Sequence, residues 1–163
     1  MAKNVKDEKT NVMRVLEQKG IPYTAHAYAH EEGVAVDGVT VANMLGQDPE
    51  QVFKTLVARG ASKGIYVFVI PMAESLDLKK AAKAVGEKSI EMVAVKEINA
   101  LTGYIRGGCS PVGMKKQYPT VFHETAEIID SIMVSAGKIG AQVELAPAAL
   151  MDLVEGTMAD IVV

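Results

Sequence analysis

Three short segments of this chain carry the residues whose types and spacing could do chemistry. The first holds Lys54 between Phe53 and Thr55, at the start of a strongly apolar stretch. The other two are glycine-rich turns at residues 107–113 and 135–140, of a kind that lets backbone N–H groups approach a ligand closely. A lone ammonium facing two such turns suits an ester or phosphate group that must be polarised. It suits neither a metal cage nor a flat interaction surface.

Lys54 is predicted to begin a strand and to share one face of it with Leu56 and Ala58. Two interpretations of this lysine stay open. It either extends from the strand end into solvent, with its methylene stem along apolar surface, or it holds an ammonium at the rim of the core, where it polarises a substrate carbonyl. Spacing alone gives the two interpretations similar weight.

A row of ring side chains, His26, Tyr28 and His30, follows period-two spacing and raises the question of a metal site. Residues four apart on a strand lie about 13 Å from each other, which is too far to share one ion. His26 and Tyr28, about 6–7 Å apart, are close enough to line one pocket, and a half-exposed strand face explains them equally well. His123 has no partner at ligand spacing, so we expect no metal site.

The single cysteine, Cys109, lies inside the glycine-rich segment 107–113. As a nucleophile it would need a neighbouring base and an orienting partner, and the sequence shows neither, so a small apolar filler is the better interpretation. The segment has the spacing of neither a P-loop nor a dinucleotide-binding motif. One cysteine also excludes an internal disulfide framework and is typical of a reducing compartment.

The elements that must position these segments follow from apolar periodicity and turn residues. Strands are predicted at residues 23–30, 54–59, 65–70, 89–95, 120–123, 132–135 and 142–145. Helices are predicted at residues 10–20, 37–46, 77–86, 96–101 and 146–154, with a further helical turn at 48–51. Strand 65–70 is apolar on both faces, so it should be a central strand covered on both sides.

Several helix ends carry recognisable signals. Thr10 and Asp77 are expected to be N-caps, and Asp48 precedes Pro49 at the start of the single turn. The helix after Asp77 should direct its apolar residues inward and end at a glycine; these residues are Leu78, Ala81, Ala82 and Val85, followed by Gly86. The last helix should open at Pro147 and close at Gly156.

Composition and the order of the predicted elements indicate a single compact domain with a mixed sheet. The 163 residues are nearly half apolar, enough for a substantial core, and strands and helices interleave without regular alternation. Residues 1–9 are interpreted as a charged N-terminal tail and residues 10–163 as the domain.

The net charge of −3 argues against a protein that binds nucleic acid by bulk electrostatics alone. No apolar run reaches membrane-spanning length and the N-terminus is not signal-like, so we expect a soluble cytoplasmic protein without a membrane partner.

Five segments in order give the chain a specific resemblance. They are VFKTL at 52–56, LDLKK at 76–80, TGY at 102–104, GGCSPVG at 107–113 and SAGK at 135–138. Each is common alone, but together, across residues 12–161, they resemble the YbaK/EbsC family of aminoacyl-tRNA deacylases, relatives of the editing domain of bacterial prolyl-tRNA synthetases. The resemblance implies a single α+β domain whose mixed sheet is curved or barrel-like and is flanked by helices.

The resemblance also implies roles for individual residues. Lys54 matches the family's essential lysine and is expected to be catalytic, Tyr28 matches a tyrosine that lines the pocket, and residues 107–113 match the loop that cradles the aminoacyl end of tRNA. The full set of expected substrate-binding residues is Tyr28, His26, Thr55, Gly107, Gly108, Cys109, Ser110, Pro111, Gly113, Ser135 and Gly137. No cofactor is implied.

Two departures from the family pattern stand out. Gln142 occupies a position where one branch of the family has aspartate, and Ala136 replaces a glycine. The glutamine weakens any role for an acidic group and points to the EbsC-like branch. Cys109 occupies a loop position that need not be cysteine in the family, which agrees with the filler interpretation.

The expected function is trans-editing, by cleavage of the ester of cysteinyl-tRNA that carries the proline anticodon, with Cys-tRNA(Cys) as a further candidate substrate. The resemblance implies that the thiol of the substrate itself attacks the ester, whether the enzyme is classed as a hydrolase or a lyase. Two alternatives stay open: a deacylase for alanine or serine on tRNA, and a non-catalytic EbsC-like regulator. The expected partner is the aminoacylated 3′ end of tRNA, prolyl-tRNA synthetase is a candidate partner, and the oligomeric state stays open.

Overall fold

A computed structural model describes residues 9–28, 40, 43, 44, 46 and 48–163 of the chain. Its helices are α1 (Asn11–Gln18), α3 (Leu78–Val85), α4 (Val95–Thr102) and α5 (Pro147–Val154), with short 3₁₀ helices at η2 (Pro49–Gln51) and η3 (Glu124–Glu127). Its strands are β1 (Tyr23–Ala27), β2 (Phe53–Gly60), β3 (Ile65–Pro71), β4 (Ile90–Met92), β5 (Thr120–His123), β6 (Ile132–Ser135), β7 (Ala141–Leu145) and β8 (Thr157–Ala159).

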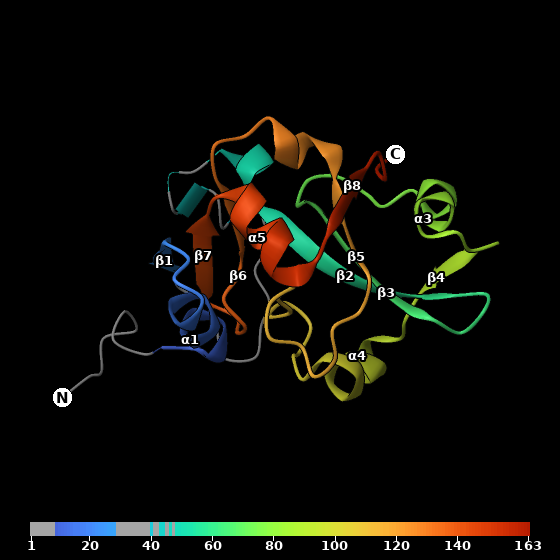
Figure 1. Cartoon of the computed structure of the whole chain (residues 1–163), viewed down its shortest axis with the longest axis horizontal. Helices are drawn as coiled ribbons and strands as arrows, with labels where there is room; N and C mark the ends of the chain where they lie inside the picture. Colours follow the sequence, from blue (N-terminus) through green and yellow to red (C-terminus); the bar gives the residue numbers. More distant parts are fainter. Residues whose placement is uncertain (1–8, 29–39, 41–42, 45, 47) are drawn as a thin grey trace.

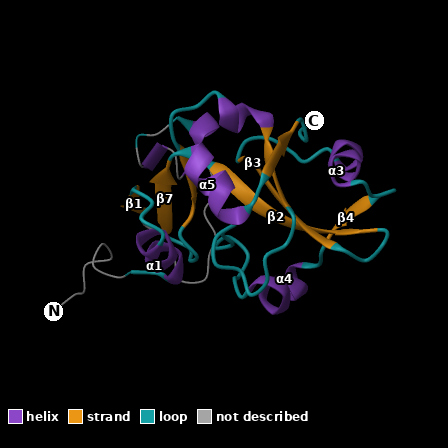
Figure 2. Ribbon diagram, in the orientation of Figure 1, coloured by secondary structure: helices purple, strands orange, loops and turns teal. Residues whose placement is uncertain are grey.

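The strands form two sheets that lie side by side (Figure 1, Figure 2). The larger sheet has the order β4-β2-β3-β5-β8, in which β2 is antiparallel to β3 and β4, while β5 is parallel to β3 and β8. The smaller sheet, β1-β7-β6, is antiparallel throughout. A single parallel bridge between Val52 and Met133 joins the two where β2 begins. The predicted α+β domain with a mixed sheet is therefore confirmed, and the sheets do not close into a barrel.

Helices cover the sheets on separate sides and define two main cores. Val12 and Leu16 of α1 pack with Val134 and Val143 of the smaller sheet, together with residues of β2, β3, β5 and α5. On the opposite face of the larger sheet, α3 packs against alternate residues of β2, β3 and β5. Strand β3 is central and its Val67–Ile70 segment is fully buried, as its two-sided apolar sequence predicts.

The N-caps predicted from the sequence are confirmed at three helices. The Thr10 side chain accepts a hydrogen bond from the Met13 backbone N–H, and Asp77 accepts from both Lys79 and Lys80. Asp48 caps η2 in the same way, by accepting from Glu50. These caps satisfy N–H groups that the helix itself leaves unpaired, so the start of each element is set by residues next to it in sequence.

Four sequence predictions differ from the structure. Strand β8 was not expected, because three residues after a helix show no periodicity. Leu78 is 41% exposed rather than buried, since it occupies the first helical position, at the edge of the packed face. Helix α5 closes at Glu155, which adopts a left-handed φ of 54° one residue before Gly156. The first predicted strand ends at Ala27, and most of the predicted helix 37–46, like tail residues 1–8, lies outside the described residues.

Candidate active site

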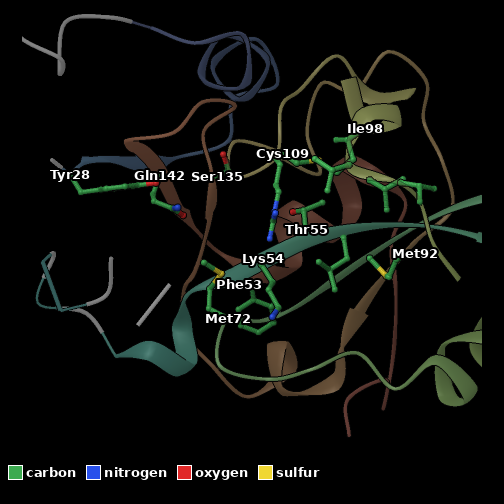
Figure 3. A pocket seen from close by; sticks show the side chains of 16 residues that line it. Tyr28, Phe53, Lys54, Thr55, Met72, Met92, Ile98, Cys109, Ser135 and Gln142 are labelled. Carbon is green, nitrogen blue, oxygen red and sulfur yellow. The ribbon is translucent and has the colours of Figure 1, made fainter. Parts of the chain in front are cut away.

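A pocket lies along one edge of β2, between the two sheets (Figure 3). It encloses about 590 Å³, within the range of small-molecule sites. Its walls come from β2 and the segments around it. The lining residues are Tyr28, Phe53, Lys54, Thr55, Leu56, Val57, Met72, Met92, Val93, Val95, Ile98, Arg106, Gly107, Cys109, Ser135 and Gln142.

Strand pairing explains why a pocket forms at this edge. Strand β4 pairs only with residues Ala58–Gly60 of β2, and among the described residues the one backbone bridge to the smaller sheet is that of Val52 with Met133, just before β2 begins. Between these two contacts, residues 53–57 have β3 on one side and no strand among the described residues on the other. The pocket occupies this interrupted position, where a continuous sheet would have another strand.

The register shows that Thr55 directs backbone groups toward the pocket. Val67 donates its N–H away from β2, to Pro119, and its partner Val57 accepts from Val93 on the β4 side. Val57 and Val67 are thus a pair without mutual ladder bonds. Because such pairs alternate along an antiparallel ladder, Thr55, two residues away, also turns its N–H and C=O from β3 toward the open edge. Its buried hydroxyl oxygen has no hydrogen-bond partner among the described atoms.

Lys54 is partly buried beside Thr55 at the centre of the pocket (Figure 3). Burial lowers the pKa of its ammonium below the ordinary value, and the negative charge of Glu74 opposes this effect. No aspartate or glutamate is among the described residues that line the pocket. The described lining therefore carries two positive side chains, Lys54 and Arg106, and no carboxylate.

Cys109 lines the pocket as a thiol rather than a thiolate. It is 9% exposed, and burial raises its pKa to about 11, although a hydrogen bond with the Thr102 side chain opposes this rise. The thiolate is the nucleophilic form. A thiol with this pKa is neutral near pH 7, which agrees with the interpretation of Cys109 as an apolar filler.

The two glycine-rich turns contact each other, and together they form one wall of the pocket. A Cβ placed on Gly108 would be 2.9 Å from the Lys138 Cα, so the turns meet backbone to backbone. Gly113 and Gly137 have φ of 75° and 101°, and both lie against Tyr104. The Tyr104 hydroxyl donates to the carbonyl of Val112, which ties the second half of the 107–113 turn in place.

The structure brings together about half of the residues expected in the site. Tyr28, Lys54, Thr55, Gly107, Cys109 and Ser135 line the pocket. Gly108, Ser110, Pro111, Gly113 and Gly137 lie in the turns but are not in the lining. Ser110 is completely buried, and its hydroxyl accepts from the Val112 N–H, just as the Ser135 hydroxyl accepts from the Gly137 N–H. Those two hydroxyls stabilise the turns.

His26 does not line the pocket. Its Nε2 lies 2.8 Å from Oε1 of Glu144 on the neighbouring strand, and Ser131 donates to the other carboxylate oxygen. The Ser131 hydrogen bond, followed by that of His26, lowers the pKa of Glu144. His30 lies outside the described residues, and within the described part of the chain no group of three or more His, Cys, Asp or Glu side chains is arranged to hold a metal ion.

Several pocket residues had no signal strong enough to predict them as site residues. Gln142 was noted only as a departure from a family pattern, yet it is 4% exposed and its Oε1 has no hydrogen-bond partner among the described atoms. The strand sequence Ala141–Leu145 alternates apolar residues with Gln142 and Glu144, so its pattern alone does not distinguish Gln142 from a residue of a polar strand face. Arg106 and the apolar wall at Met92 and Val95 depend on tertiary placement that local patterns do not contain.

Comparison with known proteins agrees with this arrangement. Residues 33–153 match the aminoacyl-tRNA editing domain family. A protein of Enterococcus faecalis named "Putative Cys-tRNA(Pro)/Cys-tRNA(Cys) deacylase EbsC" is 49% identical over 161 residues, which cover 99% of this chain and 98% of the relative. Within the described residues, no helix is long and apolar enough to cross a membrane.

Two solved structures share the fold. One, described as a "putative trans-editing enzyme for prolyl tRNA synthetase", superposes with a TM-score of 0.80 at 24% identity, over 96% of this chain and 99% of its own. Another, described as "hypothetical protein APE2540", gives a TM-score of 0.82 at 22% identity, over 93% of this chain and 99% of its own. Given the family match and the 49% identical relative, the chain belongs to the aminoacyl-tRNA editing domain family, enzymes that cleave aminoacyl-tRNA esters.

Proposed function

We propose that this protein removes cysteine from mischarged tRNA, with Cys-tRNA(Pro) as the main substrate and Cys-tRNA(Cys) as a second one. The observation that carries the proposal is a pocket with a partly buried ammonium, an open strand edge and no ionised thiol of its own. The name of the 49% identical relative supports the same substrates.

The proposed chemistry uses the sulfur of the substrate. The cysteinyl thiol loses its proton, and its sulfur attacks the ester carbonyl carbon of the same residue. The bond from that carbon to the ribose oxygen then breaks, the ribose oxygen takes up a proton, and cysteine leaves as a four-membered thiolactone that water opens later. Because nucleophile and carbonyl are already joined, the step avoids the entropy of recruiting an external nucleophile.

Lys54 and Thr55 supply the polarising groups in this proposal. Lys54 directs its ammonium toward the carbonyl oxygen, where negative charge develops, and the Thr55 backbone N–H at the open edge is a second donor. The turn at residues 107–113 confines the aminoacyl end. Each well-placed donor of this kind contributes about 3 kcal/mol to the transition state, so two of them account for much of a large rate enhancement.

The location and partner of the protein follow from the substrate. We propose that it acts in the cytoplasm, where tRNA is charged, and that residues 10–163 form the deacylase domain. The related structure described as a trans-editing enzyme for prolyl tRNA synthetase supports prolyl-tRNA synthetase as a transient partner that delivers mischarged tRNA.

A deacylation assay with purified charged tRNAs tests the proposal. The substrates are cysteinyl-, alanyl- and seryl-tRNA(Pro), cysteinyl-tRNA(Cys) and correctly charged prolyl-tRNA(Pro). We expect fast release of cysteine and slow release of the other amino acids. Preferential release of alanine or serine would show that the protein edits tRNA carrying that amino acid instead of cysteine. If none of the five esters is cleaved faster than without the protein, the protein binds aminoacyl-tRNA without catalysis.

A further inference from the structure

The pocket has two chemically different halves on either side of Lys54 and Thr55 (Figure 3). Tyr28, Ser135 and Gln142 form a polar half next to the smaller sheet. Met92 and Ile98 lie at the opposite end, in strand β4 and helix α4, and Val93 and Val95, which lie between them in sequence, also line the pocket. Any substrate whose ester lies at the centre must therefore place unlike groups in the two halves.

The polar half fits the amino acid. The Gln142 Oε1 is buried and has no partner among the described atoms, and an unpaired buried acceptor is costly unless a ligand donates to it. An α-amino group is such a donor, and a single cysteinyl residue is small. The amino acid end of the substrate therefore accounts for the polar half and leaves the apolar half, within the same 590 Å³ cavity, unassigned.

The apolar half presents large side chains to solvent at the pocket wall. Met92 is 44% exposed and Val95 is 56% exposed, while Ile98 next to them is partly buried against the cluster of Val57 and Cys109. A planar base can cover such a surface, since thioether sulfur makes favourable contacts with aromatic rings and the flat face of a base removes apolar side chains from water. On the other side of the ester from the amino acid, the substrate carries a nucleoside.

Arg106 adds a charge at the same pocket. It is exposed, lines the pocket and directly precedes Gly107, and no ion pair or hydrogen bond of its side chain is present among the described residues. Arginine binds phosphate through a planar, two-pronged guanidinium. The nucleoside that enters the apolar half carries a phosphate on its 5′ oxygen.

We propose that the wall formed by Met92, Val95 and Ile98 binds the terminal adenine base of tRNA, and that Arg106 binds the phosphate of that nucleotide. This inference rests on the proposed function for the choice of ligand. It fixes the orientation of the substrate in the pocket, with the amino acid next to Gln142 and the nucleotide next to α4.

Direct binding of adenosine 5′-monophosphate tests the proposal without any reaction. Isothermal titration and NMR chemical shifts of the full chain are measured with this nucleotide, with ribose 5-phosphate and with adenosine. We expect the nucleotide to bind about tenfold more tightly than either fragment. The variants M92A and V95A together should remove the advantage of the base, and R106A should remove the advantage of the phosphate.

Matched controls separate the site from general surface effects. Ile128 is an 82% exposed apolar residue outside the pocket lining, so I128A should leave the preference for the base unchanged. Lys88 is an exposed cation outside the lining, so K88A should leave the preference for the phosphate unchanged. Circular dichroism confirms that each variant is folded.

Cleavage of small esters distinguishes this inference from the proposed function. Cysteinyl adenosine should be cleaved faster than the cysteinyl ester of methyl riboside, and the M92A/V95A variant should cleave the two at similar rates. An equal loss on both esters would place the amino acid in the apolar half and overturn the inference. Equal binding of nucleotide and ribose 5-phosphate by the unaltered protein would also overturn it. If that binding preference is present but no cysteinyl ester is cleaved, only the proposed chemistry fails.

Discussion

The backbone of Gly108 lies directly against that of Lys138, so that a Cβ on Gly108 would be only 2.9 Å from the Lys138 Cα. The two turns that this contact joins are 30 residues apart in sequence and together carry Gly107, Cys109 and Ser135 to the pocket. Because the contact is to backbone, a neighbouring side chain cannot rotate away to relieve an added methyl group.

Gly108→Ala should therefore destabilise the protein and lower its activity. We expect a loss of about 1–3 kcal/mol in the free energy of unfolding, the usual cost of overpacking, measured by urea denaturation. Gly64→Ala is the matched control, since its added Cβ would meet only the ring and hydroxyl of Tyr66. If both variants unfold at the same urea concentration as the unaltered protein, the turns are not held by this contact.

Lys54→Ala should abolish most deacylation while the fold is retained. A donor of this kind is worth about a hundredfold to a thousandfold in rate, and the partly buried Lys54 side chain contributes little packing. Single-turnover rates on cysteinyl-tRNA(Pro), alongside circular dichroism, measure the two effects separately. Lys54→Arg should also be slow, since a planar guanidinium does not replace a compact ammonium. Activity within a few-fold of the original would remove Lys54 from the mechanism.

The rate should fall at high pH when Lys54 loses its charge. Burial lowers the pKa of Lys54 below the ordinary lysine value, so this fall should begin at lower pH than a solvated lysine would give. Glu74 raises that pKa, and Glu74→Gln should therefore shift the alkaline fall in kcat/KM to still lower pH.

Glu127→Gln removes an exposed carboxylate that lies outside the pocket lining and should leave the alkaline limb in place. At lower pH, kcat/KM should rise as the substrate thiol ionises, with a reference pKa of about 8.5. This rise should be the same in the unaltered protein, in Glu74→Gln and in Glu127→Gln. An alkaline limb that moves upward in Glu74→Gln would contradict the assignment.

The substrate thiol, rather than Cys109, should be the nucleophile. Seryl-tRNA is nearly the same size as cysteinyl-tRNA but carries a hydroxyl that ionises far less readily, so it should be cleaved much more slowly. Cys109→Ala should retain this difference, because the pKa of about 11 keeps that thiol neutral. Equal rates on the two esters would assign the attack to water, and a folded but inactive Cys109→Ala would assign it to the protein.

Turnover should not depend on a metal ion. Prolonged dialysis against a chelator should leave the rate on cysteinyl-tRNA unchanged, since Lys54 and backbone donors do the polarising in the proposed mechanism. Metal content measured before and after dialysis serves as the control. A loss of activity that Zn²⁺ restores would show that the histidine residues have been misinterpreted.

The sequence was sufficient where the determining residues are neighbours in the chain. Thr10, Asp48 and Asp77 cap helices through contacts two or three residues away, and the central strand β3 was evident from its own side chains. The family motifs likewise marked Lys54, Thr55 and the glycine-rich turns, all of which the structure places in or around one pocket.

What the sequence could not show depends on strand register and on distant partners. The open edge at Thr55 exists because β4 pairs with only three residues of β2, which no local pattern records. His26 was expected in the pocket, but Glu144, 118 residues away, holds its ring. The exposure of Met92 follows from its place at the end of a short edge strand, although its apolar character alone favours burial.

Pairing of β1 with β7 has a consequence for how the protein is made. Tyr28 and Gln142 enter the pocket from opposite ends of the sequence, and the strands leading to them pair residue by residue from Tyr23 with Leu145 to Ala27 with Ala141. During synthesis the first strand must wait, unpaired, until the later one leaves the ribosome. Contacts between residues so far apart in sequence form slowly, so we expect the polar end of the pocket, with Tyr28 and Gln142, to be completed only after β7 has been synthesised.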